Sequence, residues 1–435
     1  MTQDGTSTNQ ASTKQKCILA YSGGLDTSVA IRWMNDQLGY DVVALSIDLG
    51  EAKDLRVAQE RALRTGASAA YVVDAKRLFI ENFAFPSLMA GALYEGVYPL
   101  ATALGRPLIA KLLVDLAREE SAGAVAHGCT GKGNDQVRFD VAVAALAPDL
   151  QVVAPVRDWD MGRPDELRYA AEHGIEVPVT IESPYSVDAN LWGRSIESGV
   201  LEDPWEEAPP DVFEWTADPH DAPPDGALIE IRFEHGIPVA VDGEAMAPHD
   251  LVAHLNALGG GHGVGRVDHV ENRLVGIKSR EIYEAPGAAI LFAAHDALEA
   301  LTLSRDVMRF KRIVADEWAR LVYDGLWFSA LRHDLWSFVR STQEFVTGEV
   351  RLRLQRGSVR VVGRKGPQSL YRHDLATYDR AQDSFSHTAA KGFIELFGLP
   401  LRTQTTVQGT LGEASRKLLP DKLERLEAPR EARRG

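Results

Sequence analysis

Short apolar runs alternate with longer amphipathic segments over the first third of the chain. Five runs have the length and composition of buried strands: Cys17–Tyr21, Val42–Ile47, Ala70–Val73, Ala124–His127 and Val152–Val156. After the first run, apolar residues recur at the spacing of one helix face, at Val29, Ala30, Trp33, Met34 and Leu38. A second such face follows the second run, at Leu55, Ala58, Ala62 and Leu63. Strands that alternate with helices predict a parallel sheet covered on both faces.

The second half has a different pattern. Two hairpins are predicted, one from Leu228–Phe233 and Ile237–Val241, the other from Glu349–Leu354 and Val359–Val362. Between them, two segments have helical spacing, Ala288–Leu303 and Asp306–Tyr323. Before them, Glu202–Asp225 is rich in Pro, Asp and Glu and is expected to form a surface loop. This mixture of hairpins and helices is typical of an α+β domain.

Changes in composition and hydrophobic pattern divide the chain into four expected parts. The first residues are mostly Thr, Ser, Gln and Asn, so residues 1–15 are expected to be a disordered tail. The pattern changes again near Ile175–Tyr185. We therefore expect an α/β domain over residues 16–180 and an α+β domain over residues 181–405. The polar, charged stretch Leu411–Gly435 keeps a few leucines, and residues 406–435 are expected to form a C-terminal arm outside the compact body.

Composition and charge exclude several classes of protein. The chain has 435 residues, with 62 acidic and 47 basic side chains and a formal charge of −15. Such a balance argues against a general nucleic-acid binder, whose affinity rests on basic side chains. Two cysteines, Cys17 and Cys129, are too few for a disulfide framework. With no membrane-spanning stretch and no secretory signal in the sequence, we expect a cytoplasmic protein with no membrane partner.

The segment Ala20–Ser28, with the sequence AYSGGLDTS, is the most informative for chemistry. It lies between a predicted strand and a predicted helix. Its glycines allow backbone N–H groups to approach a ligand, and the helix N-terminus attracts an anion. No lysine occupies it, so it is not the GxxxxGK[ST] phosphate loop. The alternative is a turn in which Asp26 or Thr27 merely caps the helix. Its place after the first strand of an alternating fold favours a polyphosphate site.

A second glycine-rich segment, His127–Arg138, follows another predicted strand. Lys132 is suited to a phosphate, Asn134 and Asp135 to the head group of an amino acid, and Arg138 to a carboxylate. The alternative is a flexible loop with incidental charge. Two such loops after two strands of one sheet favour binding, because ligands of these folds lie at the carboxyl ends of the strands.

These two segments and the string GVGRVDHVENRLVGIKSREIYE, over Gly263–Glu284, together resemble the argininosuccinate synthase family. The resemblance runs from about Lys16 into the C-terminal arm. It implies a nucleotide-binding domain, a synthetase domain and an arm that assembles a homotetramer. It also implies ligation of citrulline to aspartate through a citrullyl-adenylate, with ATP converted to AMP and pyrophosphate, and with Mg²⁺ on the pyrophosphate.

The resemblance assigns binding residues position by position. ATP contacts fall on Ala20, Tyr21, Ser22, Gly23, Gly24, Leu25, Asp26, Thr27, Ser28, Ile47 and Gly128. Aspartate contacts fall on Thr130, Asn134 and Asp135. Citrulline contacts fall on Tyr98, Asn134, Arg138, Ser186, Ser195, Glu271 and Tyr283. The family has a serine where this chain has Ala103, and Thr102 is the candidate replacement for its hydroxyl.

The remaining residues are less specific. From the residues alone, Ser186 and Ser195 would lie in a loop with a helix cap, and Glu271 and Tyr283 would form a surface pair. His127 and His262 are expected to be structural, as are Tyr94, Trp192 and Trp318. No spacing suggests a zinc site or a nucleophilic triad. Asp26 is the one catalytic candidate and the first candidate for a Mg²⁺ ligand, and no other metal ligand is assigned.

Two rival functions stay open from the sequence. One is another ligase of the ATP pyrophosphatase type, either amidating or tRNA-thiolating. The acidic balance and the lack of a cysteine pair argue against thiolation, and no glutaminase-like segment is evident. The other is a non-catalytic nucleotide sensor, which would have no need of the second cluster.

Overall fold

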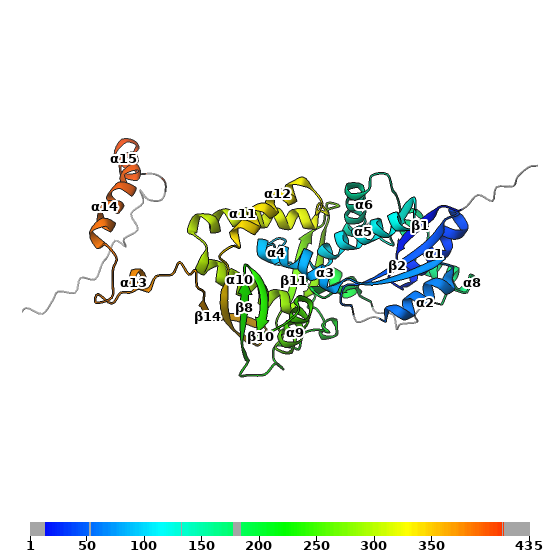
Figure 1. The fold of residues 1–435 in the computed structure, drawn as a ribbon, viewed down its shortest axis with the longest axis horizontal. Coiled ribbons are helices and arrows are strands. Elements are labelled where there is room, and N and C mark those ends of the chain that lie inside the picture. Colours follow the sequence, from blue (N-terminus) through cyan, green and yellow to red (C-terminus); the bar gives the residue numbers. More distant parts are fainter. Residues whose placement is uncertain (1–13, 52–53, 132, 177–183, 411, 413–435) are drawn as a thin grey trace, which may run out of the picture. The chain divides into compact units, whose positions relative to one another are not determined.

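A computed structural model describes residues 14–51, 54–131, 133–176, 184–410 and 412. The chain forms two compact units, one that ends at Leu370 and one that starts at Tyr371, and each is described by itself (Figure 1). The described residues of the first unit form three sheets. The predicted domain boundaries at residues 180 and 405 stay predictions.

The first sheet is parallel, as predicted, and has the order β3-β2-β1-β4-β5. Its strands are β1 (Lys16–Ala20), β2 (Asp41–Asp48), β3 (Ala69–Asp74), β4 (Ala124–Ala126) and β5 (Gln151–Val153). Alternate residues of β1 pack on opposite faces. Cys17 and Leu19 join the core under α1 (Leu25–Gln37) and α8 (Arg163–Glu172). Ile18 joins the core under α5 (Ala101–Glu119) and α6 (Asn134–Leu146).

This strand order fixes where a ligand can bind. The chain runs outward from β1 to β2 and β3, then returns to place β4 on the other side of β1. The loops after β1 and β4 therefore separate at the carboxyl edge of the sheet, the switch point at which open α/β sheets bind ligands. The two glycine-rich segments are these two loops.

The second half of the first unit is α+β, as predicted. One antiparallel sheet has the order β10-β9-β8-β13-β14, and both predicted hairpins lie in it. Its strands are β8 (Ala227–Glu234), β9 (Ile237–Val241), β10 (Glu244–Ala245), β13 (Gly348–Gln355) and β14 (Ser358–Lys365). The predicted helices are α10 (Pro286–Thr302) and α11 (Arg305–Tyr323). Further helices of this half are α9 (Pro248–Gly261) and α12 (Ala330–Thr342).

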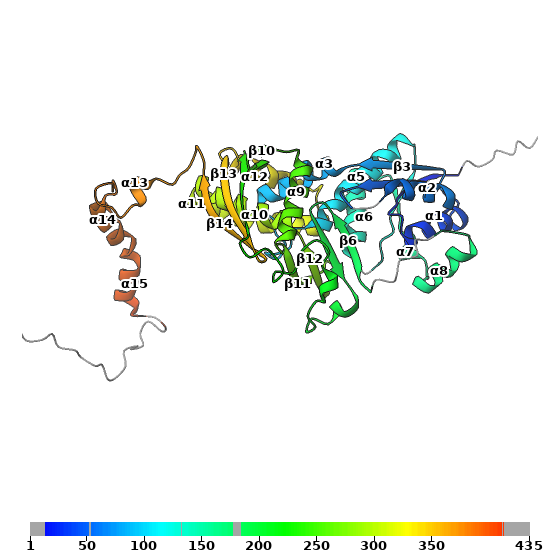
Figure 2. The same ribbon diagram turned by 90° about the horizontal axis from the view of Figure 1, so that it is seen from below.

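The third sheet corrects one interpretation. Residues 186–197 form a hairpin, β6 (Ser186–Asn190) and β7 (Gly193–Glu197), and not a loop with a helix cap. This hairpin pairs with β12 (Lys278–Glu284), which pairs with β11 (Arg266–Asn272). Figure 2 shows β6, an edge strand of this sheet, on the side of β11 and β12 that faces α5. β6 pairs with its neighbour β7, whose other partner, β12, lies far along the chain. Local composition did not reveal this polar hairpin, because strand formation depends on such tertiary context.

Hydrogen bonds at the hairpin turn hold it against the start of α5. Asn190 Nδ2 donates to the Ala101 carbonyl oxygen at 2.7 Å, and Trp192 Nε1 donates to the Pro99 carbonyl oxygen at 3.0 Å. Trp192 is fully buried, as is Trp318, in accord with their expected packing roles. These bonds fix the third sheet to α5, which covers one face of the parallel sheet.

The second unit contains α13 (His373–Ala376), α14 (His387–Phe397) and α15 (Leu399–Gln408). None of the residues of these helices is buried. Large apolar side chains such as Phe393, Ile394, Phe397 and Val407 are more than 60% exposed. Almost all of the leucine-containing stretch 411–435 lies outside the described residues. Across the described part of the chain, no helix is both long and apolar enough to cross a membrane.

Candidate active site

A cavity of about 490 Å³ lies between the carboxyl edge of the parallel sheet, α5 and the third sheet. Sixteen of the residues predicted as ligand contacts line it: Ala20, Tyr21, Ser22, Thr27, Ile47, Tyr98, Thr102, Gly128, Thr130, Asn134, Asp135, Arg138, Ser186, Ser195, Glu271 and Tyr283. The other five predicted contacts lie next to the cavity, in the loop after β1 and the first turn of α1: Gly23, Gly24, Leu25, Asp26 and Ser28. The structure thus brings the three predicted groups of contacts to one place.

The loop after β1 is held by its own hydroxyl groups. Tyr21 Oη and Ser28 Oγ are 3.0 Å apart, and Ser22 Oγ and Thr27 Oγ1 are 3.1 Å apart. Gly23 has a left-handed φ of +79°, which favours glycine. Gly24 is the N-cap residue and no side chain caps α1, so Asp26 and Thr27 do not act as its caps. The first N–H groups of α1 are then suited to a phosphate.

Asp26 has a buried acidic neighbour that the sequence did not reveal. Glu166 of α8 is 5% exposed and hydrogen-bonded to the Asp26 side chain. Burial, followed by the charge of Asp26, raises the pKa of Glu166 to about 8. Glu166 is therefore protonated at neutral pH. Only the packing of α8 against α1 brings them together, and no local pattern around Glu166 indicates it.

The loop after β4 touches the loop after β1. A Cβ on Gly128 would lie 2.8 Å from Thr27 Cγ2, so only glycine fits without a shift. His127 is 2% exposed, its Nε2 lies 2.9 Å from Asp140 Oδ1, and its ring stacks on Phe139. These contacts agree with the structural role expected of His127. His262 is also buried and lies away from the cavity lining. Lys132 lies outside the described residues.

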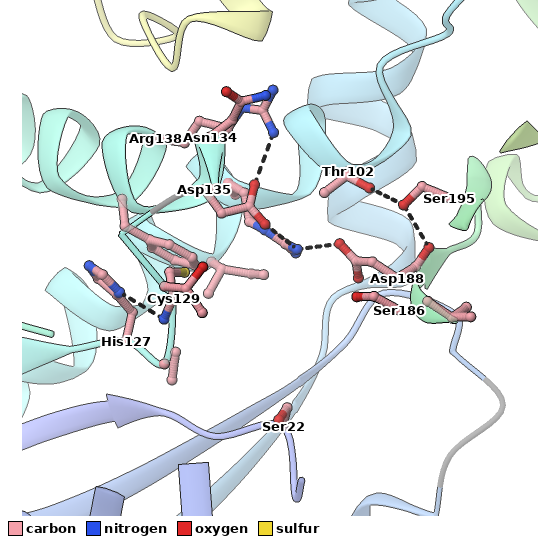
Figure 3. Close-up of a pocket in the computed structure, with 18 of the residues that line it drawn as sticks. Ser22, Thr102, His127, Cys129, Asn134, Asp135, Arg138, Ser186, Asp188 and Ser195 are labelled. Atoms are coloured by element: carbon pink, nitrogen blue, oxygen red, sulfur yellow. Dashed lines mark hydrogen bonds and ion pairs between the residues drawn. The ribbon is translucent and has the colours of Figure 1, made fainter. Parts of the chain in front are cut away.

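A chain of ion pairs crosses the cavity (Figure 3). Arg138 Nη1 donates to Asp135 Oδ1 at 2.9 Å, and Arg106 Nη2 donates to Asp135 Oδ2 at 2.8 Å. Arg106 also pairs with Asp188 of β6. Burial opposes ionisation of Asp135, but the two guanidinium groups lower the pKa of its carboxyl to about 2. The cavity therefore presents fixed charges of both signs, as two zwitterionic ligands require.

Hydroxyl groups and tyrosine rings form the opposite wall. Thr102 Oγ1 lies 3.3 Å from Ser195 Oγ, and the Tyr98 hydroxyl accepts from the Thr102 backbone N–H at 3.1 Å. Tyr98 stacks on Tyr283 with ring centroids 4.0 Å apart. Ala103, the next residue of α5, is fully buried in the apolar core and does not line the cavity. In this chain, Thr102 presents the hydroxyl of this segment to the cavity.

Glu271 and Tyr283 are buried and not a surface pair, which corrects the interpretation from their residues alone. Their exposures are 3% and 4%. Tyr283 Oη donates to Glu271 Oε2 at 2.5 Å. They occupy neighbouring strands, β11 and β12, whose inner face closes the cavity.

Six further charged residues line the cavity but were not predicted: Glu51, Arg106, Asp188, Glu197, Arg273 and Glu281. Arg273 pairs with both Glu197 and Glu281. Burial, followed by the charge of Glu197, raises the pKa of Glu281 to about 8. The sequence spacing from predicted contacts could have indicated three of these six. Arg106 follows Thr102 by one helical turn, and Asp188 and Glu197 follow Ser186 and Ser195 by two strand positions.

Comparison with known proteins places the chain in a family. A model described as the arginosuccinate synthase N-terminal HUP domain matches residues 16–176. A model described as the arginosuccinate synthase C-terminal domain matches residues 185–404. Both predicted parts of the resemblance are therefore present, in the expected order.

Similar proteins named argininosuccinate synthase cover almost the whole chain. The one from Oceanobacillus iheyensis is 57% identical over 93% of this chain and 96% of its own length. The one from Symbiobacterium thermophilum is 57% identical over 91% of this chain and 98% of its own length. The one from Dehalococcoides mccartyi strain 195 is 55% identical over 92% of this chain and 98% of its own length. The chain belongs to the argininosuccinate synthase family.

Proposed function

We propose that the protein ligates citrulline to aspartate at the expense of ATP and forms argininosuccinate, AMP and pyrophosphate, a step of arginine biosynthesis. The observation that carries this proposal is the single cavity that joins a glycine-rich phosphate loop to fixed charges of both signs. A phosphate loop alone would suit many nucleotide enzymes. The adjoining charges suit two amino-acid substrates, and membership of the argininosuccinate synthase family supports citrulline and aspartate as those substrates.

In the first step, the ureido oxygen of citrulline attacks the α-phosphorus of ATP and pyrophosphate leaves. The loop Ala20–Ser28 and the N-terminus of α1 hold the phosphates, with Ile47 near the adenine and Gly128 beside the nucleotide. The protein contributes no nucleophile. It supplies position and a fixed electrostatic environment, which are the main sources of catalysis in such a step.

In the second step, the amine of aspartate attacks the citrullyl-adenylate and AMP leaves. Thr130, Asn134 and Asp135 hold aspartate, and the ionised carboxylate of Asp135 suits its ammonium group. Citrulline is held by its predicted contacts: Tyr98, Thr102, Asn134, Arg138, Ser186, Ser195, Glu271 and Tyr283. The carboxylates of Asp188 and Glu197 on the same hairpin suit the N–H groups of the ureido end.

Asp26, in the first turn of α1 beside the phosphate loop, is the residue that would hold Mg²⁺. Within the described residues, no group of three or more His, Cys, Asp or Glu side chains could hold a metal. Mg²⁺ bound with substrate phosphates needs only one or two carboxylates. The buried neighbour Glu166 carries a proton at neutral pH and supplies none. Held by Asp26, the ion would neutralise charge on the leaving pyrophosphate.

The exposed apolar side chains of α14 and α15 support a homotetramer, in which this segment packs on a neighbouring copy. We also propose a cytoplasmic location, since both amino-acid substrates and ATP are available there. No nucleic-acid or membrane partner is proposed.

Product analysis tests the proposed function. The protein is incubated with ATP, citrulline and aspartate, and nucleotides and amino acids are then separated. We expect AMP and pyrophosphate in equal amounts, dependent on citrulline, together with argininosuccinate. ADP and phosphate as the main products would contradict the proposal. AMP formed with another acceptor would favour a different ligase of the ATP pyrophosphatase type, and bound but unchanged ATP would favour a sensor.

A further inference from the structure

Tyr323, the last residue of α11, is fully buried and contacts three of the proposed substrate-binding residues at once. Those residues are Asn134 and Arg138 of α6 and Glu271 of β11. Tyr323 does not line the cavity. Nothing in its sequence context, the end of an amphipathic helix, distinguishes it from a packing residue.

The hydroxyl group of Tyr323 bridges Glu271 and Asn134. Tyr323 Oη donates to Glu271 Oε1 at 2.5 Å and accepts from Asn134 Nδ2 at 2.8 Å. The backbone N–H of Leu274 donates to Asn134 Oδ1 at 2.9 Å, which fixes which end of this amide carries the oxygen. Burial and the charge of Glu271 raise the pKa of Tyr323, so the hydroxyl stays protonated as a donor.

The rest of Tyr323 holds Arg138. Arg138 Nε donates to the Tyr323 carbonyl oxygen at 2.9 Å, and the guanidinium carbon lies 4.8 Å from the ring centroid. The ring of Tyr323 also stacks on that of Tyr94, with centroids 3.6 Å apart. The end of α11 fits closely on α6, since a Cβ on Gly325 would lie 2.7 Å from Arg138 Cα. The ring of Tyr323 therefore has little freedom to turn.

We propose that Tyr323 is a positioning residue that aligns the citrulline and aspartate sites through Glu271, Asn134 and Arg138. Glu271 takes one tyrosine hydroxyl on each oxygen, from Tyr283 and Tyr323, and its remaining lone pairs serve an ammonium group. Asn134 is assigned to both substrates, so one hydroxyl orients groups for both. This inference rests on the proposed substrate assignments.

The test compares Tyr323→Phe with Tyr94→Phe in the full-length protein. The first substitution removes the bridging hydroxyl and keeps the ring. The second removes a hydroxyl whose bond runs to the Asn272 carbonyl oxygen, outside the site, and keeps the stacked ring. We expect Tyr323→Phe to raise the KM of citrulline about tenfold and that of aspartate several-fold, since a lost bond to a charged group changes affinity by roughly this factor. Tyr94→Phe should leave the KM of citrulline and the KM of aspartate within about twofold of the parent values.

A double-mutant cycle with Glu271→Gln separates positioning from general loosening of the fold. If Tyr323 acts through Glu271, its substitution has a much smaller effect on citrulline KM in the Glu271→Gln background. Fully additive effects, or a citrulline KM of Tyr323→Phe equal to that of the parent, would overturn the proposal. The parent protein is assayed alongside. Its failure to form argininosuccinate would overturn the proposed function instead.

Discussion

At the residue scale, Thr102 and Ala103 are neighbours on α5 with different surroundings. Thr102 faces the cavity and Ala103 the core. Thr102→Val removes a hydroxyl worth about 0.5–1.5 kcal/mol, so the citrulline KM should rise several-fold in steady-state kinetics. Ala103→Ser should leave the KM of both substrates unchanged. Burial of its hydroxyl should instead lower the free energy of unfolding by about 1–3 kcal/mol. A larger KM effect from Ala103→Ser would reverse this assignment.

Asp135 should make stability depend on pH in acid. Its folded pKa of about 2 lies below its ordinary value of 3.8, so its contribution is present above pH 3.8 and is lost as pH falls toward 2. The shift is worth at most about 2.5 kcal/mol. Asp135→Asn should therefore lower the free energy of unfolding in urea at pH 5–7, and the gap from the parent should narrow below pH 4.

Asp149 offers a matched control. The pKa of its exposed carboxyl is also lowered to about 2, by Arg118. Solvent screens this pair, so Asp149→Asn should have a much smaller effect than Asp135→Asn. Equal effects of the two substitutions, or a gap for Asp135→Asn that stays constant down to pH 3, would contradict the buried ion-pair chain.

At the element scale, the contact between the two glycine-rich loops is the feature most open to test. Gly128→Ala places a methyl group against Thr27, whereas a Cβ on Gly131 has its nearest neighbour, Arg157 Cγ, at 3.8 Å. Overpacking costs about 1–3 kcal/mol, and here it pushes the phosphate loop. Gly128→Ala should raise the KM of ATP and leave those of citrulline and aspartate nearly unchanged. Gly131→Ala should change none of them. Similar kinetics of the two variants would show that the loops are not coupled.

Elements were predictable where burial and local pattern agree. The strands β1 and β2 are apolar on consecutive positions because both faces of the sheet are covered, and this signal is strong. The hairpin of β6 and β7 was missed because its polar residues serve the cavity and its partner β12 is distant. Likewise, Glu166 and Tyr323 act through packing of α8 and α11, which no local spacing encodes.

At the scale of the whole molecule, the resemblance supplied the substrates and the order of the domains, while the physical pattern supplied the fold class. Neither the resemblance nor the hydrophobic pattern predicted the order of the strands in the parallel sheet. It is the order β3-β2-β1-β4-β5 that explains why loops over 100 residues apart meet at one cavity.

Assembly should depend on the apolar side chains of the second unit. Phe393 and Phe397 stack on each other with centroids 5.3 Å apart on exposed α14. The double substitution Phe393→Glu and Phe397→Glu should lower the molar mass in light scattering, because charges replace apolar surface that a neighbouring copy would cover. Gln404→Glu on α15 adds a charge at an exposed polar position and should leave the mass unchanged. A mass unaffected by the double substitution would refute this role of α14.

Isotope transfer reports whether the citrulline ureido oxygen attacks the α-phosphorus of ATP. Citrulline labelled with ¹⁸O in its ureido group is incubated with ATP, aspartate and the protein, and the products are analysed by mass spectrometry. Because the bond from this oxygen to phosphorus survives when aspartate displaces AMP, we expect one ¹⁸O in the phosphate of AMP and none in pyrophosphate. AMP without the label, or ¹⁸O retained in argininosuccinate, would contradict it.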